Sequence, residues 1–475
     1  MIGITSYGAY VPVTRLPLAL IGGSRGEGGP EKAVASYDED ALTMGVSAAV
    51  ECLRGFDRAA VDAVFVGSTT LPYQEKLAAS IVAKALDLRR DVATADYGGS
   101  LRAGASALRG ALDAVTAGTA RCALVVASDC RMAAPRSALE RNIGDGAAAF
   151  LVGDTRCILS CEGLHAVSDE ILDVWRTAGD PFVHTWEERF VVEHGHRSVL
   201  LEAVRGLLQK TGLAPGDFAR AAFYAPDPAS HQAAARAAGF GAERLQPALF
   251  GRLGNTGAAF APMLLVAALE EARPGERLLF ASYGDGAEAS AWRATAEIEK
   301  LGPRRAMNWH LGHRRAIRDY ATYLRPRHLE AAEHDVRQAP GISATVHFRE
   351  RDHDLSFRGA RCRRCGTEQF PPQRVCYSCH TRDDFESLRF SDRPGRLLSW
   401  TLDYFFPTPE PPLAAGVVQI EGGARAYLQL TDVASDELRC ELPLEFVFRR
   451  IHEVGGKPNY FWKATPLRNT RLEPQ

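Results

Sequence analysis

The stretch LGNTGAAFAPMLLVAALEEA, residues 253–272, combines a turn of small residues with a long apolar segment of helical character. A short β-branched and aromatic segment, FARAAFYA (218–225), precedes it, and ERLLFAS (276–282) follows it. A strand, a glycine-rich helix start, a helix and a second strand in this order are typical of a βαβ unit.

The first half of the chain contains the same order of segments. VDAVFVG (61–67) predicts a buried strand, residues 95–116 a helix that begins among small residues, and RCALVVAS (121–128) another strand. We therefore expect an α/β protein with an internally duplicated unit and a mostly parallel sheet covered by helices. The alternative is that the two halves look alike only because all α/β chains repeat strands and helices in this way.

Composition restricts the class of protein. The 475 residues allow several domains, and 46% hydrophobic with 24% charged residues is an ordinary globular balance. A formal net charge of -2 argues against a nucleic-acid binder. The longest apolar run is broken at Pro262 and closed by Glu270, short of the roughly 18 residues of a membrane span. No basic and apolar leader begins the chain, so we expect neither a signal peptide nor a membrane partner.

Four of the ten cysteines form a metal-binding pattern. Cys362, Cys365, Cys376 and Cys379 stand as two C-x-x-C pairs separated by ten residues. Each pair can present two thiolates from one turn, so that four sulfurs surround Zn²⁺ at about 2.3 Å and leave no open position. We therefore predict a structural zinc ion rather than four free thiols or a redox pair. The other six cysteines are scattered, which fits a reducing, cytoplasmic compartment.

The C-terminal third differs in pattern from the rest. Residues 303–335 are rich in arginine and histidine and predict a helical arm. From residue 342 onward the side chains alternate with a period of two, as in 343–348 and 397–404, with turns at Pro394-Gly395 and Gly422-Gly423. We expect a separate all-β module, consistent with a small barrel.

Several motifs of the first 330 residues resemble archaeal-type hydroxymethylglutaryl-CoA synthase, of the thiolase superfamily, and they occur in the same order. They are EKAVASYDEDALTM (31–44), GSTTLPYQEK (67–76), NIGDGAAAFLVG (142–153), LGNTGAA (253–259), SYGDGA (282–287) and YATYLRPR (320–327). The resemblance implies a duplicated thiolase-like fold of five layers, αβαβα, a CoA thioester substrate and a homodimer.

Residues 355–470 are similar to the DUF35 family, a rubredoxin-like zinc ribbon followed by an OB-fold barrel. The matching segments are RCRRCGTEQFPPQRVCYSC (361–379) and GRLLSWT (395–401). Relatives of that family accompany thiolase-type enzymes and are associated with acyl-CoA binding. The domains expected from both resemblances are 1–155 and 156–335 for the two thiolase-like halves, 336–390 for a linker and the zinc ribbon, and 391–475 for the OB-fold.

The resemblance also places the synthase's catalytic residues, and three of them differ in this chain. Its nucleophilic cysteine aligns with Asp96, its histidine with Tyr224 and its glutamate with Thr69, whereas Asn255 in the G-N-T turn matches. A carboxylate is a poor acyl acceptor, because the mixed anhydride it would form is high in energy. Covalent acyl transfer is therefore disfavoured.

The other half of the synthase reaction is an aldol-type step, and we expect this step on an acyl-CoA or acyl-carrier thioester without a covalent intermediate. Tyr224 would exchange a proton with a β-hydroxyl, Asp96 would orient it or act as the base, and Asn255 would donate to the thioester oxygen. Two alternatives stay open. One is an acyltransferase that resembles hydroxymethylglutaryl-CoA synthase, and the other is a scaffold that binds acyl-CoA without catalysis.

Overall fold

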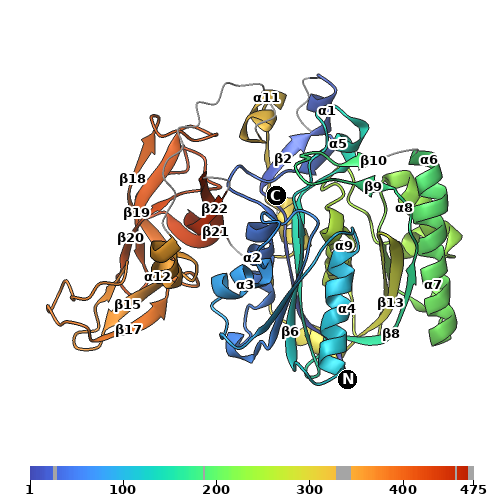
Figure 1. Ribbon diagram of the computed structural model, residues 1–475, viewed down its shortest axis with the longest axis horizontal. Helices are drawn as coiled ribbons and strands as arrows, with labels where there is room; N and C mark the ends of the chain where they lie inside the picture. The colour runs from blue at the N-terminus through green and yellow to red at the C-terminus, as the bar shows by residue number, and fades with distance from the viewer. Residues whose placement is uncertain (25–28, 186–187, 328–343, 455–456, 469–475) are drawn as a thin grey trace.

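The computed structural model of the chain describes residues 1–24, 29–185, 188–327, 344–454 and 457–468. Figure 1 shows a layered α/β core and, beside it, a smaller unit rich in strands that the C-terminal part of the chain builds. Within these described ranges, no helix has the length and apolar character needed to cross a membrane.

A nine-stranded sheet runs through the core. Its first-half strands and its second-half strands meet where β1 pairs with β8. In the order of the sheet, the strands are β11 (Arg220–Phe223), β12 (Arg277–Tyr283), β13 (Gly286–Ala294), β8 (Leu159–Ser168), β1 (Gly3–Tyr10), β7 (Gly146–Gly153), β6 (Cys122–Asp129), β4 (Ala63–Gly67) and β5 (Ala93–Tyr97).

The sheet is mixed, and the expectation of a mostly parallel sheet is wrong. β4 pairs in parallel with β5 and β6, and β11 with β12, but β6–β7, β7–β1, β1–β8, β8–β13 and β12–β13 are antiparallel. The reason is local at β12 and β13, which only Gly284 and Asp285 connect, both with positive φ. Such a two-residue turn forces a hairpin. The pairing order β4–β6–β7–β1 recurs as β11–β12–β13–β8, which supports the duplication.

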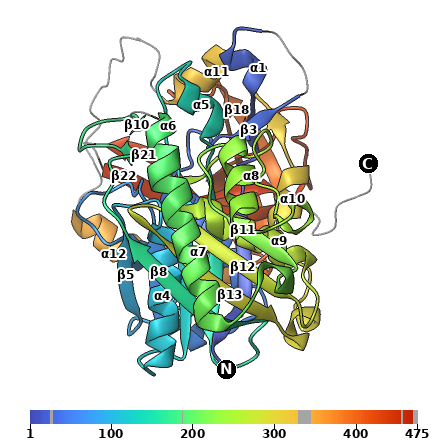
Figure 2. The same cartoon turned by 90° about the vertical axis from the view of Figure 1, so that its right-hand side faces the viewer.

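Helices cover the sheet in three layers, and the strands fill the two layers between them, as Figures 1 and 2 show. The outer layers pack on the first and the second half of the sheet, and the central layer lies between the halves. The first outer layer is α2 (Ala41–Cys52) and α3 (Ala78–Ala85), the central layer is α4 (Ala103–Thr116) and α9 (Phe260–Glu271), and the other outer layer is α7 (Ser198–Thr211) and α8 (Pro228–Ala237).

The central helix α9 is buried at every position from Phe260 to Leu269, as a helix covered on all sides must be. The five-layer αβαβα arrangement expected for the core is thus confirmed. Short elements complete it: β2 (Thr14–Pro17), α1 (Leu18–Ile21), β3 (Glu31–Ala33), α5 (Ala138–Asn142), β9 (Val174–Trp175), β10 (His184–Thr185), α6 (Glu188–Phe190), α10 (Met307–Gly312), β14 (Arg315–Ala316) and α11 (Tyr320–Leu324).

The C-terminal unit consists of two sheets. The smaller has the order β16–β15–β17 and the larger β20–β19–β18–β21–β22, and a bridge between Leu430 and Ala464 brings its two ends together as a barrel. Their strands are β15 (Arg358–Cys362), β16 (Glu368–Gln369), β17 (Phe385–Arg389), β18 (Gly395–Asp403), β19 (Leu413–Ile420), β20 (Arg425–Gln429), β21 (Pro443–Val454) and β22 (Lys457–Pro466).

Two expectations about the segments before the barrel need correction. Residues 344–354 form a helix, α12 (Ala344–Asp354), and not the strand that the alternation predicted. The helix packs on β15 and β22, and tertiary packing overrides a period of two that lasts only six residues. The helical arm of residues 303–335 is formed by α10 and α11 with β14 between them, and its residues 328–335 lie outside the described ranges.

The barrel is joined to the core by buried charges. Arg449 of β21 has no exposed surface, and its guanidinium lies 2.8 Å from Asp432 of the barrel and 3.2 Å from Glu39 of the core. Lys463 of β22 lies 2.9 Å from Asp38, which is also a core residue. Cations of the barrel therefore neutralise carboxylates that the core buries just before α2.

Candidate functional site

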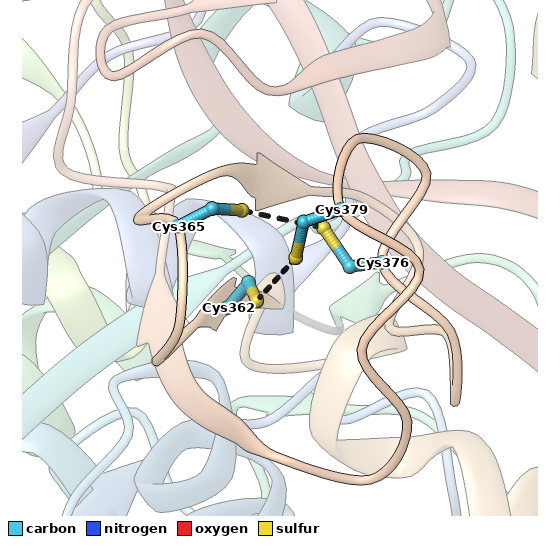
Figure 3. Close-up of side chains that lie close together, drawn as sticks. All are labelled: Cys362, Cys365, Cys376 and Cys379. Carbon is cyan, nitrogen blue, oxygen red and sulfur yellow. Dashed lines mark hydrogen bonds between the residues drawn. The ribbon is translucent and has the colours of Figure 1, made fainter.

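The four cysteines of the two C-x-x-C pairs converge, as Figure 3 shows. Their sulfur atoms all lie within 4.8 Å of one another, and the pairs Cys362–Cys379 and Cys365–Cys376 have Sγ–Sγ distances of 3.6 Å. Four thiolates arranged tetrahedrally at about 2.3 Å from Zn²⁺ would stand about 3.8 Å apart. The cluster therefore fits a structural zinc ion, as the sequence predicted.

The backbone explains why each pair presents its sulfurs alike. The carbonyl of Cys362 accepts from the N–H of Gly366, and the carbonyl of Cys376 accepts from the N–H of His380, at 2.8 and 3.0 Å. Gly366 and His380 both have positive φ, which closes each turn. Hydrogen bonding with Thr381 lowers the pKa of the Cys379 thiol to about 6, whereas desolvation raises the pKa of the Cys362 thiol to about 11.

A polar group of residues lies at the carboxyl ends of the core strands. Tyr224 directly follows β11, and Asn255 stands in the turn before α9. The Asn255 amide donates one hydrogen to the Tyr224 hydroxyl at 3.1 Å and the other to the carbonyl of Ala225 at 3.0 Å. The side-chain oxygen of Asn255 accepts from the N–H of Gly257 at 2.9 Å. The structure thus brings Tyr224 and Asn255 together, but both amide hydrogens are already donated within the protein.

Asn255 is held in place by the first half of the core. Its backbone N–H donates to the carbonyl of Asn142 at 2.6 Å, and its backbone carbonyl accepts from the N–H of Gly144 at 3.0 Å. A Cβ at Gly144 would lie 2.0 Å from the carbonyl oxygen of Leu253, so only glycine permits this approach. The motifs NIGDGAAAFLVG and LGNTGAA meet here.

Asp129, the last residue of β6, organises the next part of the site. One carboxylate oxygen accepts from the Ser68 hydroxyl at 2.9 Å, from the Thr69 N–H at 2.7 Å and from the Thr70 hydroxyl at 2.9 Å. The other accepts from the Thr69 hydroxyl at 2.9 Å and from the Ala258 N–H at 2.7 Å. Thr69 therefore lies at the junction of the two halves, with its hydroxyl hydrogen donated to Asp129.

The structure corrects the position assigned to Asp96. Its two carboxylate oxygens accept from the N–H groups of Ala78 and Ala79 at 2.6 and 2.8 Å, so it caps the first turn of α3. The helix predicted for residues 95–116 would have put Asp96 at its start, but Asp96 lies in β5, and α4 begins only at Ala103 after several further residues. The hydrogen bonds that the structure describes for the Asp96 carboxylate therefore go to α3 and not to Tyr224.

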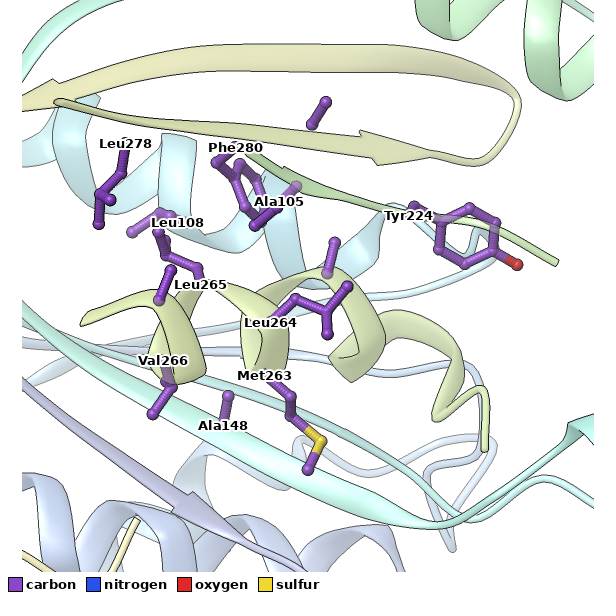
Figure 4. Close-up of a cluster of buried hydrophobic side chains, with 14 of the residues drawn as sticks. Ala105, Leu108, Ala148, Tyr224, Met263, Leu264, Leu265, Val266, Leu278 and Phe280 are labelled. Carbon is purple, nitrogen blue, oxygen red and sulfur yellow. The ribbon is translucent and has the colours of Figure 1, made fainter. Parts of the chain in front are cut away.

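Burial and nearby charges determine the state of Tyr224. Only 3% of it is exposed, and burial raises the pKa of its phenol to about 12, although Arg131 and the Asn255 hydrogen bond oppose this and Asp173 adds to it. In Figure 4 the Tyr224 ring lies at the end of a cluster of apolar side chains, with its hydroxyl pointing away from them. The phenol is protonated at neutral pH, and its own hydrogen is free to be donated.

His196 supports Tyr224 from behind. Its Nε2 lies 2.9 Å from the Tyr224 carbonyl oxygen, and its ring contacts the Tyr224 ring edge to face. Burial lowers the pKa of His196 to about 4, so it is neutral. No sequence pattern singles out His196, Asp173 or Arg131, whereas Asp129 is recognisable as the polar residue that ends a buried strand.

Known proteins resemble the two units separately. The ChsH2 rubredoxin-like zinc ribbon domain matches residues 354–386. Hydroxymethylglutaryl-CoA synthase of Aeropyrum pernix is 35% identical over 342 residues, 68% of this chain and 94% of the relative, and that of Archaeoglobus fulgidus is 35% identical over 341 residues, 69% and 98%.

Solved structures agree on the fold. A hydroxymethylglutaryl-CoA synthase complexed with CoA has a TM-score of 0.62 at 19% identity, covering 72% of this chain and 94% of its own. MvaS in complex with 3-hydroxy-3-methylglutaryl coenzyme A has a TM-score of 0.58 at 22% identity, with coverages of 72% and 95%. The chain is 35% identical to the two archaeal enzymes over nearly their whole length. It therefore belongs to the hydroxymethylglutaryl-CoA synthase family of the thiolase superfamily and carries a ChsH2-type zinc ribbon in the same polypeptide.

Proposed function

We propose that the protein catalyses a non-covalent, aldol-type cleavage or formation of a C–C bond at the β-carbon of an acyl-CoA or acyl-carrier thioester. The observation that carries this proposal is the buried, protonated Tyr224 phenol, which Asn255 fixes while its own hydrogen stays available. A phenol of this kind suits proton exchange with a β-oxygen, and in its protonated state it is a weak nucleophile toward an acyl group.

The thiols support a reaction without an acyl-enzyme. Residues 100–102, Ser-Leu-Arg, directly precede α4 and contain no cysteine. The cysteine that directly follows Asp129 is Cys130, and burial together with the charge of Asp145 raises its pKa well above the ordinary range. A thiol in that state is a poor nucleophile at neutral pH, because the thiolate is the reactive form.

In the cleavage direction, the β-hydroxyl gives its proton to the Tyr224 oxygen as Tyr224 passes its own proton on. The Cα–Cβ bond then breaks, its electron pair moves into the thioester carbonyl as an enolate, and an aldehyde or ketone leaves. Asp173 is the carboxylate we assign to receive the proton, in place of Asp96. It is 7% exposed, burial raises its pKa, and its charge reaches Tyr224. Condensation is the reverse, with Tyr224 as the proton donor.

The test offers a panel of β-hydroxyacyl-CoA thioesters and measures the release of aldehyde or ketone. We expect Tyr224→Phe and Asp173→Asn each to lower turnover by about 10²- to 10⁴-fold, the range of general acid–base catalysis. Tyr323→Phe is the matched control, because Tyr323 is equally buried but packs against α1 and β2. Full activity in Tyr224→Phe would refute the assignment, and CoA binding without turnover across the panel would replace it with the scaffold.

The archaeal relatives favour a second candidate, an acyltransferase that works like hydroxymethylglutaryl-CoA synthase. This candidate requires a covalent acyl-enzyme. After incubation with acetyl-CoA, intact mass spectrometry should show an unmodified chain if the reaction is non-covalent. An adduct that survives denaturation would establish acyl transfer and identify its nucleophile after digestion.

We also propose a cytoplasmic homodimer. β5 is an edge strand of the nine-stranded sheet, so its free edge could pair with that of a second copy. Light scattering that finds only single chains at micromolar concentration would refute the dimer. All ten cysteines are free of disulfides, which supports a reducing compartment.

A further inference from the structure

Arg131 is buried beside the proposed site and was not found from the sequence. It is 7% exposed, and its side chain crosses Gly257 so closely that a Cβ there would lie 2.6 Å from the Arg131 Cδ. Gly257 has a φ of +59°, which favours glycine as well. Gly257 donates to the Asn255 side chain, which in turn donates to the Tyr224 hydroxyl, so Arg131 passes beside the group that fixes Tyr224, and its charge lowers the Tyr224 pKa.

The guanidinium of Arg131 does not contribute to the fold through a polar contact with any residue that the structure describes. Among the residues that the structure describes, none forms a hydrogen bond or an ion pair with it. Asp129 is its neighbour across Gly257, but the Asp129 oxygens already accept five hydrogen bonds. Its guanidinium nitrogens are not among the buried side-chain atoms that lack a partner, so they keep accessible surface that a ligand can reach.

The proposed reaction needs a group that stabilises the enolate, and Arg131 can supply it. When the Cα–Cβ bond breaks, negative charge develops on the thioester oxygen, and a positioned donor or cation must stabilise it. Asn255 does not fill this role, because both hydrogens of its amide are donated to Tyr224 and Ala225. Arg131 is within electrostatic reach of the Tyr224 hydroxyl, where the β-oxygen of the substrate would lie two bonds from the enolate carbon.

We propose that Arg131 binds the thioester oxygen and stabilises the enolate that forms there, which makes it a catalytic residue. This inference rests on the proposed aldol-type function. The bond changes are those given above: the electron pair of the broken Cα–Cβ bond delocalises onto the thioester oxygen, and the guanidinium neutralises that charge without transferring a proton. The site would therefore bind a CoA derivative with negative charge at this position more tightly than a neutral one.

The experiment measures binding with two CoA thioethers by calorimetry, using the full chain. S-carboxymethyl-CoA places a carboxylate where the enolate would lie, and S-ethyl-CoA is its neutral counterpart. We expect the wild type to prefer the anionic probe by about 10- to 100-fold, as for one charge-assisted hydrogen bond. Arg131→Met should abolish this preference and leave the affinity for S-ethyl-CoA unchanged, whereas Arg131→Lys should retain part of it.

Arg136→Met is the control, since Arg136 is exposed and lies in the same loop. An anionic preference that survives in Arg131→Met, in a variant whose melting temperature shows that it is folded, would overturn the inference. So would a loss of affinity for both probes alike, which would mean that Arg131 only maintains the pocket. Turnover of β-hydroxyacyl-CoA by the wild type is measured separately. Release of aldehyde or ketone together with an unchanged preference would reject Arg131 alone, and no release would reject the aldol-type function.

Discussion

Replacing Arg449 by methionine should weaken the attachment of the barrel to the core. The guanidinium is fully buried between Glu39 at 3.2 Å and Asp432 at 2.8 Å. Methionine removes the cation but fills much of its volume, so both carboxylates stay buried without their partner. Removing one member of a buried ion pair costs about 3–5 kcal/mol.

The neighbouring groups place the expected loss at the lower end of this range, about 3 kcal/mol. Asp38 keeps Lys463 at 2.9 Å, so its charge remains neutralised. Burial already raises the pKa of Glu39 to about 7, and without Arg449 this carboxyl takes up a proton more readily and becomes neutral. The penalty then falls mainly on Asp432.

The assay is urea unfolding of the full chain, followed by tryptophan fluorescence and circular dichroism. Arg396→Met is the matched control, because its partner Glu441 lies at 3.0 Å on the same barrel but both side chains are more than half exposed. Such a surface pair contributes at most about 1 kcal/mol. A loss in Arg449→Met no larger than that in Arg396→Met would refute the idea that buried charges join the two units.

Other predictions concern the metal, acid stability and α3. Cys376→Ser should reduce the zinc content below one ion per chain in metal analysis and lower the stability of the C-terminal unit, whereas unchanged values would contradict the structural site. Burial lowers the pKa of His196 from 6.5 to about 4, so between these values the unfolded chain binds more protons and stability falls as the pH falls. His196→Gln should flatten this slope in melting curves recorded from pH 7 to 4, and an unchanged slope would exclude His196 as its source. Asp96→Ala should cost about 1 kcal/mol through the lost cap and leave turnover intact, and a loss of turnover would return Asp96 to the site.

The sequence was sufficient where the structure depends on neighbouring residues. The zinc cluster follows from two C-x-x-C turns, each closed by hydrogen bonds within a few residues, so spacing alone identified all four ligands. The buried helix α9 and the turn before it were equally clear from the apolar segment 260–269. The motifs also indicated the family, because their order along the chain is independent of how the chain folds.

Other features depend on residues far apart in the chain. Asp96 and the start of α4 are only a few residues apart, yet the capping of α3 and the longer connection direct the carboxylate elsewhere. Asp129 gains its role from donors on residues 68–70 and 258, which no local pattern links to it. The state of Tyr224 likewise depends on burial by segments from the whole core.

Residue patterns along the chain were enough to predict the two units, the family, the zinc ligands, and Tyr224 and Asn255 as site candidates. The fold was needed to establish that Asp96 caps a helix, that the Asn255 amide has no hydrogen left for a ligand, and that no residue in the described ranges pairs with Arg131. The physical reason is that a side chain's chemistry is local, whereas its hydrogen-bond partners and its burial are set by which strand ends the fold brings together.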